Sequence, residues 1–92
     1  MPNVEPIFNF VFTDHALHEM ARRQITQEDV RTVLAKPEQM EMVREGRAVY
    51  QSKLEIGDPP KTYLLRVFVD IEPVPPFVVT VYRTSKIEKY WR

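Results

Sequence analysis

The spacing of hydrophobic and polar residues changes once along the chain, from a helical period in the first third to strand-like alternation in the remainder. In the first third, apolar residues recur at the three- and four-residue spacing of one helix face: Leu17, Met20 and Ala21. Thr13 follows the strand-like residues 7–12 and is a suitable N-cap, while Gln24 and Ile25 close the helix. The pattern predicts a strand and then a helix that buries these three apolar side chains.

A second helix is expected directly after the first. Thr26 and Asp29 occupy the positions of a capping box, with Asp in place of the usual Glu. The buried face of this helix again has helical spacing: Val30, Val33 and Leu34. The helix should end at Lys36, because the residue before a proline is pushed away from helical backbone angles. The first third therefore consists of two short helices with a tight connection.

Alternating and β-branched segments dominate the rest of the chain. They stand at residues 40–56, with a turn at Glu45 and Gly46, and at residues 62–71 and 77–84. Proline-rich segments separate them, and residues 85–92 fit either one helical turn or an extended tail. The order strand, helix, helix and four strands predicts an α+β fold, with the helices packed on one face of a meandering antiparallel sheet.

Composition narrows the class of protein. With 92 residues the chain is expected to form one domain, which buries roughly 60–65% of its unfolded surface. The absence of cysteine excludes disulfides and thiolate chemistry, and neither a signal peptide nor a membrane span is evident, so a cytoplasmic location is expected. Thirteen basic and thirteen acidic residues cancel, which argues against non-specific nucleic-acid binding but leaves room for a local basic patch.

Both histidines of the chain lie in one stretch, FTDHALHEMARR, at residues 12–23. On a helix, the polar side away from the apolar stripe carries His15, His18, Glu19 and Arg22, with Arg23 beside it. This side is either a solvated surface, a metal site, an acid–base pair or an RNA-facing surface. Two imidazoles do not make a tight metal site and no third ligand stands out, so neither a metal nor a cofactor is expected.

Arg66 is the second unusual position, because large apolar neighbours surround it in the strongest strand. It forms an ion pair with an acidic residue, reaches the sheet edge, or binds an anion such as phosphate. Thr80 and Tyr82, on one strand face with Val78, are expected beside Arg66. Tyr50 is expected to add a further hydroxyl to this polar strip.

The runs FTDHALHEMARRQITQEDV, LLRVFVD and FVVTVY resemble the DUF4258 family of small bacterial proteins, so residues 1–92 are expected to form a single DUF4258-like domain. The matching positions, in order, are Phe10 or Phe12, His15, Ala16, Met20, Arg23, Ile25, Val30, Arg66, Thr80 and Tyr82. The resemblance implies a RelE/ParE-like toxin fold. Two positions depart from the family pattern: Glu19 replaces a frequent arginine, and Gln24 replaces a frequent glycine.

The resemblance implies a small toxin-like intracellular protein with metal-independent ribonuclease activity, acting by transesterification. In that reading His15 is the general base or acid, and Arg66 with Arg23 stabilises charge on the phosphate. Tyr82 and Thr80 orient the phosphate or the 2′-hydroxyl, and RNA is the partner because only RNA carries that nucleophile.

The alternative is a non-catalytic module of the same fold that binds an antitoxin-like protein or a second copy of itself. Arg66, Tyr50 and Tyr82 would then form the contact surface, because arginine and tyrosine are enriched at binding hot spots. Tyr90 and Trp91 are further candidate anchors, and His18 is a surface residue in either case. The neutral charge favours this alternative, whereas the combination of His, Arg and Tyr favours the ribonuclease.

Overall fold

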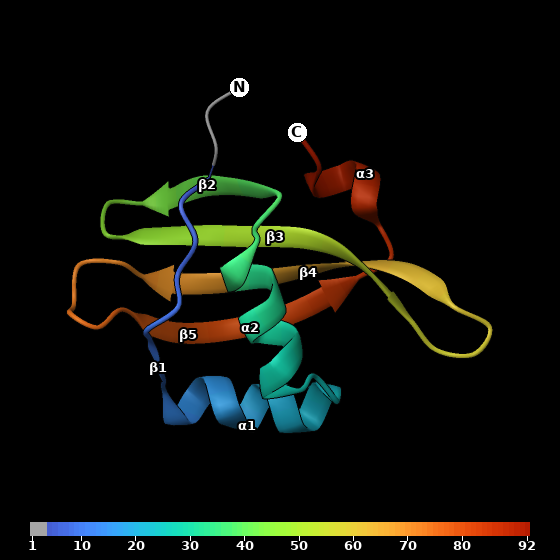
Figure 1. Ribbon diagram of the computed structural model, residues 1–92, viewed down its shortest axis with the longest axis horizontal. Helices are drawn as coiled ribbons and strands as arrows, with labels where there is room; N and C mark the ends of the chain where they lie inside the picture. Colours follow the sequence, from blue (N-terminus) through green and yellow to red (C-terminus); the bar gives the residue numbers. More distant parts are fainter. Residues whose placement is uncertain (1–3) are drawn as a thin grey trace.

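The computed structural model describes residues 4–92 and confirms the α+β architecture (Figure 1). The elements, in chain order, are β1 (Val11–Phe12), α1 (Asp14–Arg23), α2 (Gln27–Ala35), β2 (Gln39–Arg44), β3 (Arg47–Ile56), β4 (Lys61–Asp70), β5 (Phe77–Thr84) and α3 (Ile87–Tyr90). The five strands form one sheet in the order β1-β5-β4-β3-β2. All neighbours are antiparallel except the short pair β1 and β5. The predicted order of elements is thus confirmed, and residues 85–92 contain one helical turn.

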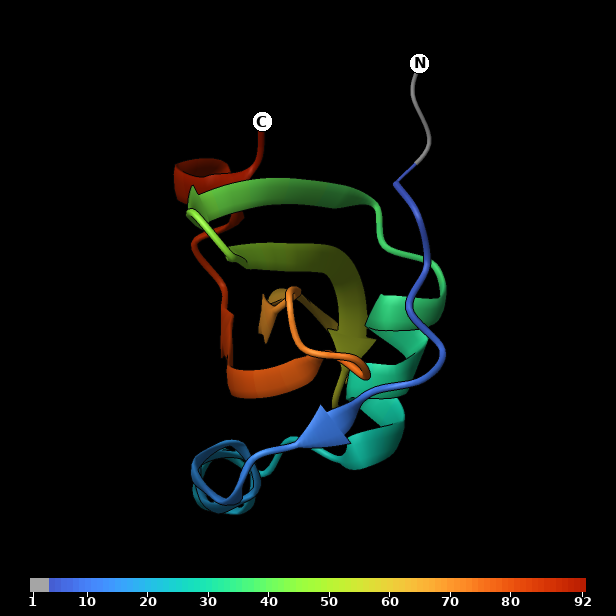
Figure 2. The ribbon, with the colours of Figure 1, turned by 90° about the vertical axis from the view of Figure 1, so that its left-hand side faces the viewer.

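Helices α2 and α3 lie on opposite sides of the sheet, while α1 runs beside β5 (Figure 2). The core lies between α2 and the inner sheet face, where Val30, Val33 and Leu34 are completely buried against strand residues such as Val67 and Val81. On the other sheet face, within residues 4–92, the C-terminal segment lies against β2 and β3, and we call this side the open face. No helix in the described part of the chain is long and apolar enough to cross a bilayer.

Both predicted helix starts are confirmed by their caps. The Thr13 hydroxyl accepts a hydrogen bond from the Ala16 backbone amide at 3.1 Å. Thr26 and Asp29 form the reciprocal capping box, so local hydrogen bonds satisfy amides that a helix start leaves unpaired. Gln24 ends α1 in the left-handed region, with φ of 57°, which explains why glycine suits this position.

The predicted apolar stripe of α1 is confirmed at Met20 but wrong at Leu17 and Ala21. Ala16 and Met20 are the buried pair, at 0% and 2% exposure, whereas Leu17 is 37% exposed and Ala21 also faces solvent. The reason is that α1 packs along β5 near one edge of the sheet, and the small side chain of Ala16 lets the helix approach the strand closely. The buried stripe therefore keeps Met20 but continues to Ala16, four residues earlier on the same helix face, and not to Leu17.

Two strand predictions also need correction. The first strand covers only Val11–Phe12; before it, the amide of Ile7 donates to the Leu34 carbonyl at 2.7 Å. In β5 a bulge shifts the register, since Phe68 pairs with Thr80 but Val69 pairs with Val78. An extra residue reverses the facing of all side chains beyond it. Val78 therefore lies in the core rather than beside Thr80 and Tyr82.

Candidate functional site

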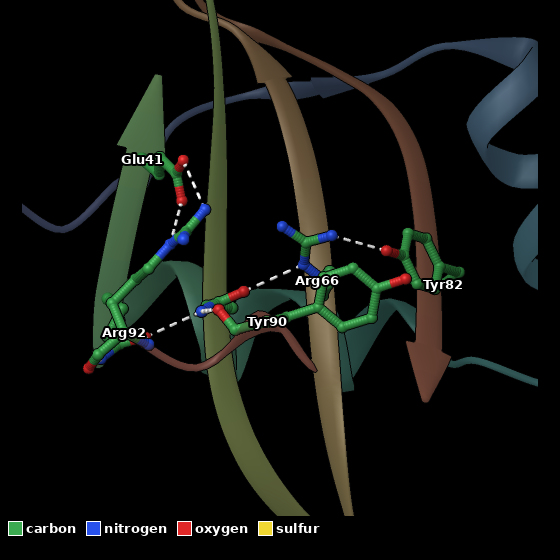
Figure 3. A network of polar contacts seen from close by, with 7 residues as sticks. Glu41, Arg66, Tyr82, Tyr90 and Arg92 are labelled. Atoms are coloured by element: carbon green, nitrogen blue, oxygen red, sulfur yellow. Dashed lines mark hydrogen bonds and ion pairs between the residues drawn. The ribbon is translucent and has the colours of Figure 1, made fainter. Parts of the chain in front are cut away.

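Arg66 lies at the centre of the open face, in register with a residue on each neighbouring strand. Gln51 on β3 and Tyr82 on β5 are its direct partners across the sheet. The Nε group of Arg66 donates to the Gln51 side-chain oxygen at 2.9 Å, and its Nη1 group donates to the Tyr82 hydroxyl at 2.6 Å (Figure 3). Strand pairing thus holds the guanidinium from both sides.

Aromatic rings surround the same guanidinium. Its central carbon lies 4.2 Å from the ring centroid of Tyr90, 5.4 Å from that of Phe68 and 5.6 Å from that of Tyr82. The rings of Phe68 and Tyr82 stack at 5.9 Å, and the Tyr90 ring meets Tyr82 edge-on at 6.3 Å. Ring faces attract a cation, so these side chains stabilise the charge without neutralising it.

No carboxylate of residues 4–92 forms an ion pair with Arg66; the ion pairs found there involve Arg22, Arg23, Arg47 and Arg92. Of the three alternatives for this arginine, the structural ion pair is therefore excluded for the described chain. Arginine has five N–H donors, and two of them are used by Gln51 and Tyr82. The guanidinium keeps both a net positive charge and donors for an anion.

The C-terminal segment, residues 87–92, lies across this face. Gln51 donates to the Tyr90 carbonyl at 3.1 Å and to the Gln39 side chain at 2.8 Å. Arg92 forms a two-pronged ion pair with Glu41 at 2.7 and 2.8 Å (Figure 3). The segment is therefore attached to β2 and β3 beside Arg66.

The two tyrosines at this site differ in acidity. Burial raises the pKa of Tyr82, and the hydrogen bond from Arg66 opposes that shift. The pKa of Tyr90 is lowered, mainly through the neighbouring Tyr82 hydroxyl. Near neutral pH the Tyr82 phenol thus holds its proton, which suits a hydrogen-bond donor or a general acid rather than a base.

Arg23 extends the site toward α1. Together with Tyr82 and Arg83 it lines an open hollow of about 410 Å³. Arg23 donates to the Val81 carbonyl at 2.8 Å and pairs with Glu19 at 3.2 Å. The hydrogen bond from Arg22 lowers the pKa of Glu19, so this carboxylate stays charged and offsets part of the local positive charge.

The structure brings together some of the predicted residues and separates others. Arg66 and Tyr82 are in contact, Thr80 faces Phe68 on the same strand pair, and Arg23 reaches Tyr82 from α1. Tyr50 does not join them: it pairs with Val67, belongs to the core and is only 6% exposed, so burial raises its pKa. Its hydroxyl cannot serve the strip, because alternate residues of a strand point to opposite faces.

His15 and His18 are exposed on α1, and neither takes part in the contacts around Arg66. Within residues 4–92, no three His, Cys, Asp or Glu side chains gather as a metal site would require. The acid–base role of His15 therefore has no geometric support from the Arg66 site and stays a prediction.

Sequence reasoning missed Gln51 and Gln39 and the position of Tyr90. The alternation of β3 carried one signal for Gln51, which stands between Val49 and Lys53 on the face opposite the core. The Gln51 side chain is only 3% exposed, and a buried amide needs hydrogen-bond partners. Its partners are Arg66, Gln39 and Tyr90. No local signal connects residue 90 with residue 66.

Residues 12–83 match a known protein family, described as "Domain of unknown function (DUF4258)". The matched range includes α1, α2 and nearly all of the sheet, and it ends before the C-terminal segment. No curated protein and no solved structure matches the chain.

Proposed function

Since the match covers most of its length, the chain belongs to the DUF4258 family, and we propose that this member is a toxin-like protein of RelE/ParE-like fold that binds single-stranded RNA on its open face. The observation that carries the proposal is the state of Arg66. Its charge is not neutralised within the described chain, and three of its N–H donors are not taken by Gln51 or Tyr82.

Phosphate is the anion that best fits this arrangement. A guanidinium binds phosphate through paired N–H donors, and the adjacent Tyr82 hydroxyl provides another polar contact. The nearby rings of Phe68 and Tyr82 provide flat faces of the kind on which unpaired bases stack. Zero net charge limits binding to a local site and a short stretch of RNA.

Ribonuclease activity is the finer part of this proposal. During transesterification Arg66 would stabilise the negative charge on the phosphate, Tyr82 would donate a proton to the leaving oxygen, and Thr80 would orient the RNA. The attacking 2′-hydroxyl also needs a base, and exposed His15 would have to meet the RNA outside the contacts around Arg66. The geometry supports RNA binding more strongly than cleavage.

The test measures binding and cleavage together. Fluorescence anisotropy of a labelled twelve-nucleotide single-stranded RNA should show that Arg66→Met weakens binding about 10-fold or more, and lowers the salt slope by about 0.7 for the lost phosphate contact. Arg31→Met is the matched control, because Arg31 is exposed on α2, on the other side of the sheet. Equal binding by both variants, or no binding by the parent in low salt, would contradict the proposal.

Cleavage is followed on the same RNA in the presence of chelator. Cleavage that is lost in Tyr82→Phe and in Arg66→Met would establish a metal-independent ribonuclease at this site. Binding without cleavage would limit the function to RNA recognition. A parallel His15→Ala variant shows whether α1 contributes the base.

A protein-binding module is the second candidate, and one observation favours it. Within the part of the chain that the structure describes, β2 is an edge strand of the sheet, and three of its apolar residues are exposed: Met40 at 43%, Met42 at 46% and Val43 at 50%. An edge strand with apolar side chains can pair with a strand of another chain, such as an antitoxin-like protein or a second copy. Met42→Lys should then abolish an association, seen by light scattering, that depends on protein concentration.

A further inference from the structure

The C-terminal segment occupies the position from which an RNA base would reach Arg66. The Tyr90 ring lies 4.2 Å from the guanidinium carbon, closer than either of the other rings. Figure 3 shows this ring extending across the guanidinium from the segment above β3. A group that approaches Arg66 from the open face therefore meets Tyr90 first.

The contacts of Tyr90 are ones that a nucleobase can reproduce. A planar ring stacks on the guanidinium, and a carbonyl oxygen accepts the hydrogen bond from Gln51 at 3.1 Å. A pyrimidine or purine such as uracil, cytosine or guanine has both features, a flat aromatic surface and a carbonyl acceptor at its edge. The Gln51 side chain, which binds the C-terminal segment, could thus bind a base in the same place.

The segment is attached in a way that permits exchange. None of the four residues of α3 is buried, and the remaining contacts lie at the surface. They are the exposed ion pair of Arg92 with Glu41, the hydrogen bonds of Arg92 with Gln39, and the stacking of Lys53 on Trp91 at 3.9 Å. Exposed ion pairs contribute little to stability, so lifting residues 87–92 leaves the core of the domain intact.

We propose that residues 87–92 are an internal competitor that covers Arg66, and that an unpaired nucleobase takes the place of the Tyr90 ring when RNA binds. The inference rests on the proposed RNA binding and adds its substrate class, an unstacked base, and its regulation. Weakening the segment must then strengthen RNA binding, because a competitor that is bound less often leaves the site open more often.

The experiment uses the full chain and the twelve-nucleotide RNA. Tyr90→Ala removes the competing ring and Glu41→Gln weakens the anchor of Arg92 without touching Arg66. Each change should raise RNA affinity, by about 3- to 10-fold, whereas Glu88→Gln, an exposed change on the same helix, should leave it unaltered. Circular dichroism confirms that each variant is folded.

Trp91 provides a direct readout, since it is the only tryptophan of the chain. If RNA displaces the segment, Trp91 leaves Lys53 and its emission changes at the RNA concentrations at which anisotropy saturates. A smaller emission change in the same direction should occur without RNA in Glu41→Gln, because the other contacts of the segment remain.

The outcomes separate this inference from the proposed function. Weaker binding by Tyr90→Ala would overturn the competitor role and make Tyr90 a stacking platform for the RNA. Unchanged affinity in Tyr90→Ala and Glu41→Gln, with Arg66→Met still defective, would overturn the competitor alone. RNA binding by the parent that becomes tighter in Tyr90→Ala and in Glu41→Gln would support both, and no binding by any variant would overturn both.

Discussion

Arg66 on β4 and Tyr82 on β5 face each other directly, and a hydrogen bond of 2.6 Å joins the guanidinium to the phenol oxygen. The pair depends on the bulge in β5, because the extra residue places Val78 in the core while it keeps Tyr82 on the open face. The shift in strand register thus serves both the core and the site.

Removal of the Tyr82 hydroxyl tests the strength of this pair. Tyr82→Phe leaves the ring in place but removes the acceptor of a charged donor, so it should lower the free energy of unfolding by about 1–2 kcal/mol. Urea denaturation of the purified variant measures the change. Tyr63→Phe is the matched control, since no hydrogen bond of the Tyr63 hydroxyl is found among residues 4–92, and it should cost less than about 0.5 kcal/mol. Equal losses in the two variants would contradict a stabilising Arg66–Tyr82 contact.

Replacement of Gln24 by glycine is expected to stabilise the protein. Its φ of 57° lies in the left-handed region, where a β-carbon is unfavourable and glycine is not. Gln24→Gly should raise the free energy of unfolding by about 1 kcal/mol and the Tm by about 4–8 °C in a domain of this size. Thermal unfolding followed by circular dichroism checks it, with Gln24→Ala as the control that retains the β-carbon and should show no such gain.

The choice of buried face on α1 can be tested by shortening one side chain on each side of the helix. Met20 is 2% exposed in the core, so Met20→Ala should destabilise the protein by about 2–4 kcal/mol through lost burial and a cavity. Leu17 lies on the exposed side at 37%, so Leu17→Ala should cost less than about 1 kcal/mol. Chemical denaturation compares the two. A larger loss for Leu17→Ala would restore the stripe predicted from spacing.

The ion pair of Arg47 with Asp70 predicts that the folded protein loses stability as the pH falls. Asp70 accepts hydrogen bonds from Arg47 at 2.7 and 3.1 Å, and this pairing lowers its pKa. The unfolded chain, with the ordinary Asp pKa of about 3.9, therefore takes up the proton at higher pH than the folded protein. The contribution of the pair to stability, about 1 kcal/mol for side chains that are each 29% exposed, is complete above that pH and is lost as the pH falls through the folded pKa.

Urea denaturation between pH 7 and pH 2 measures this effect. Asp70→Asn should be less stable than the parent at neutral pH, and the difference should shrink in acid. Arg47→Met should behave in the same way, because either change removes the pair. A constant difference at all pH values would show that the ion pair does not contribute.

Local chemistry explains which features could be predicted. The N-caps at Thr13 and Thr26 bind backbone amides only three residues further along the chain. The β2–β3 turn depends on Gly46, which has φ of 83°. The central place of Arg66 followed from the apolar residues on both sides of it. These features depend on neighbours in the sequence, so the pattern of the chain contains them.

The errors concern contacts between distant residues. Tyr50 was expected beside Arg66, although its own alternation with Ala48 and Ser52 places it on the other face. The β5 bulge depends on pairing with β4, and the buried side of α1 depends on how it approaches β5. Neither pairing can be read from one segment alone.

By itself, the sequence determined α1, α2 and the four strands β2 to β5 in their order, the caps of the two helices, and the placement of an arginine in a central strand, because each follows from residues a few positions apart. Only the tertiary structure decided that Arg66 has aromatic and amide partners, with no carboxylate partner among residues 4–92, and that Tyr90 covers it. Those facts arise from strand register and from the docking of residues 87–92 on β2 and β3. The energy of such long-range contacts is shared among many residues, so no short stretch of sequence specifies them.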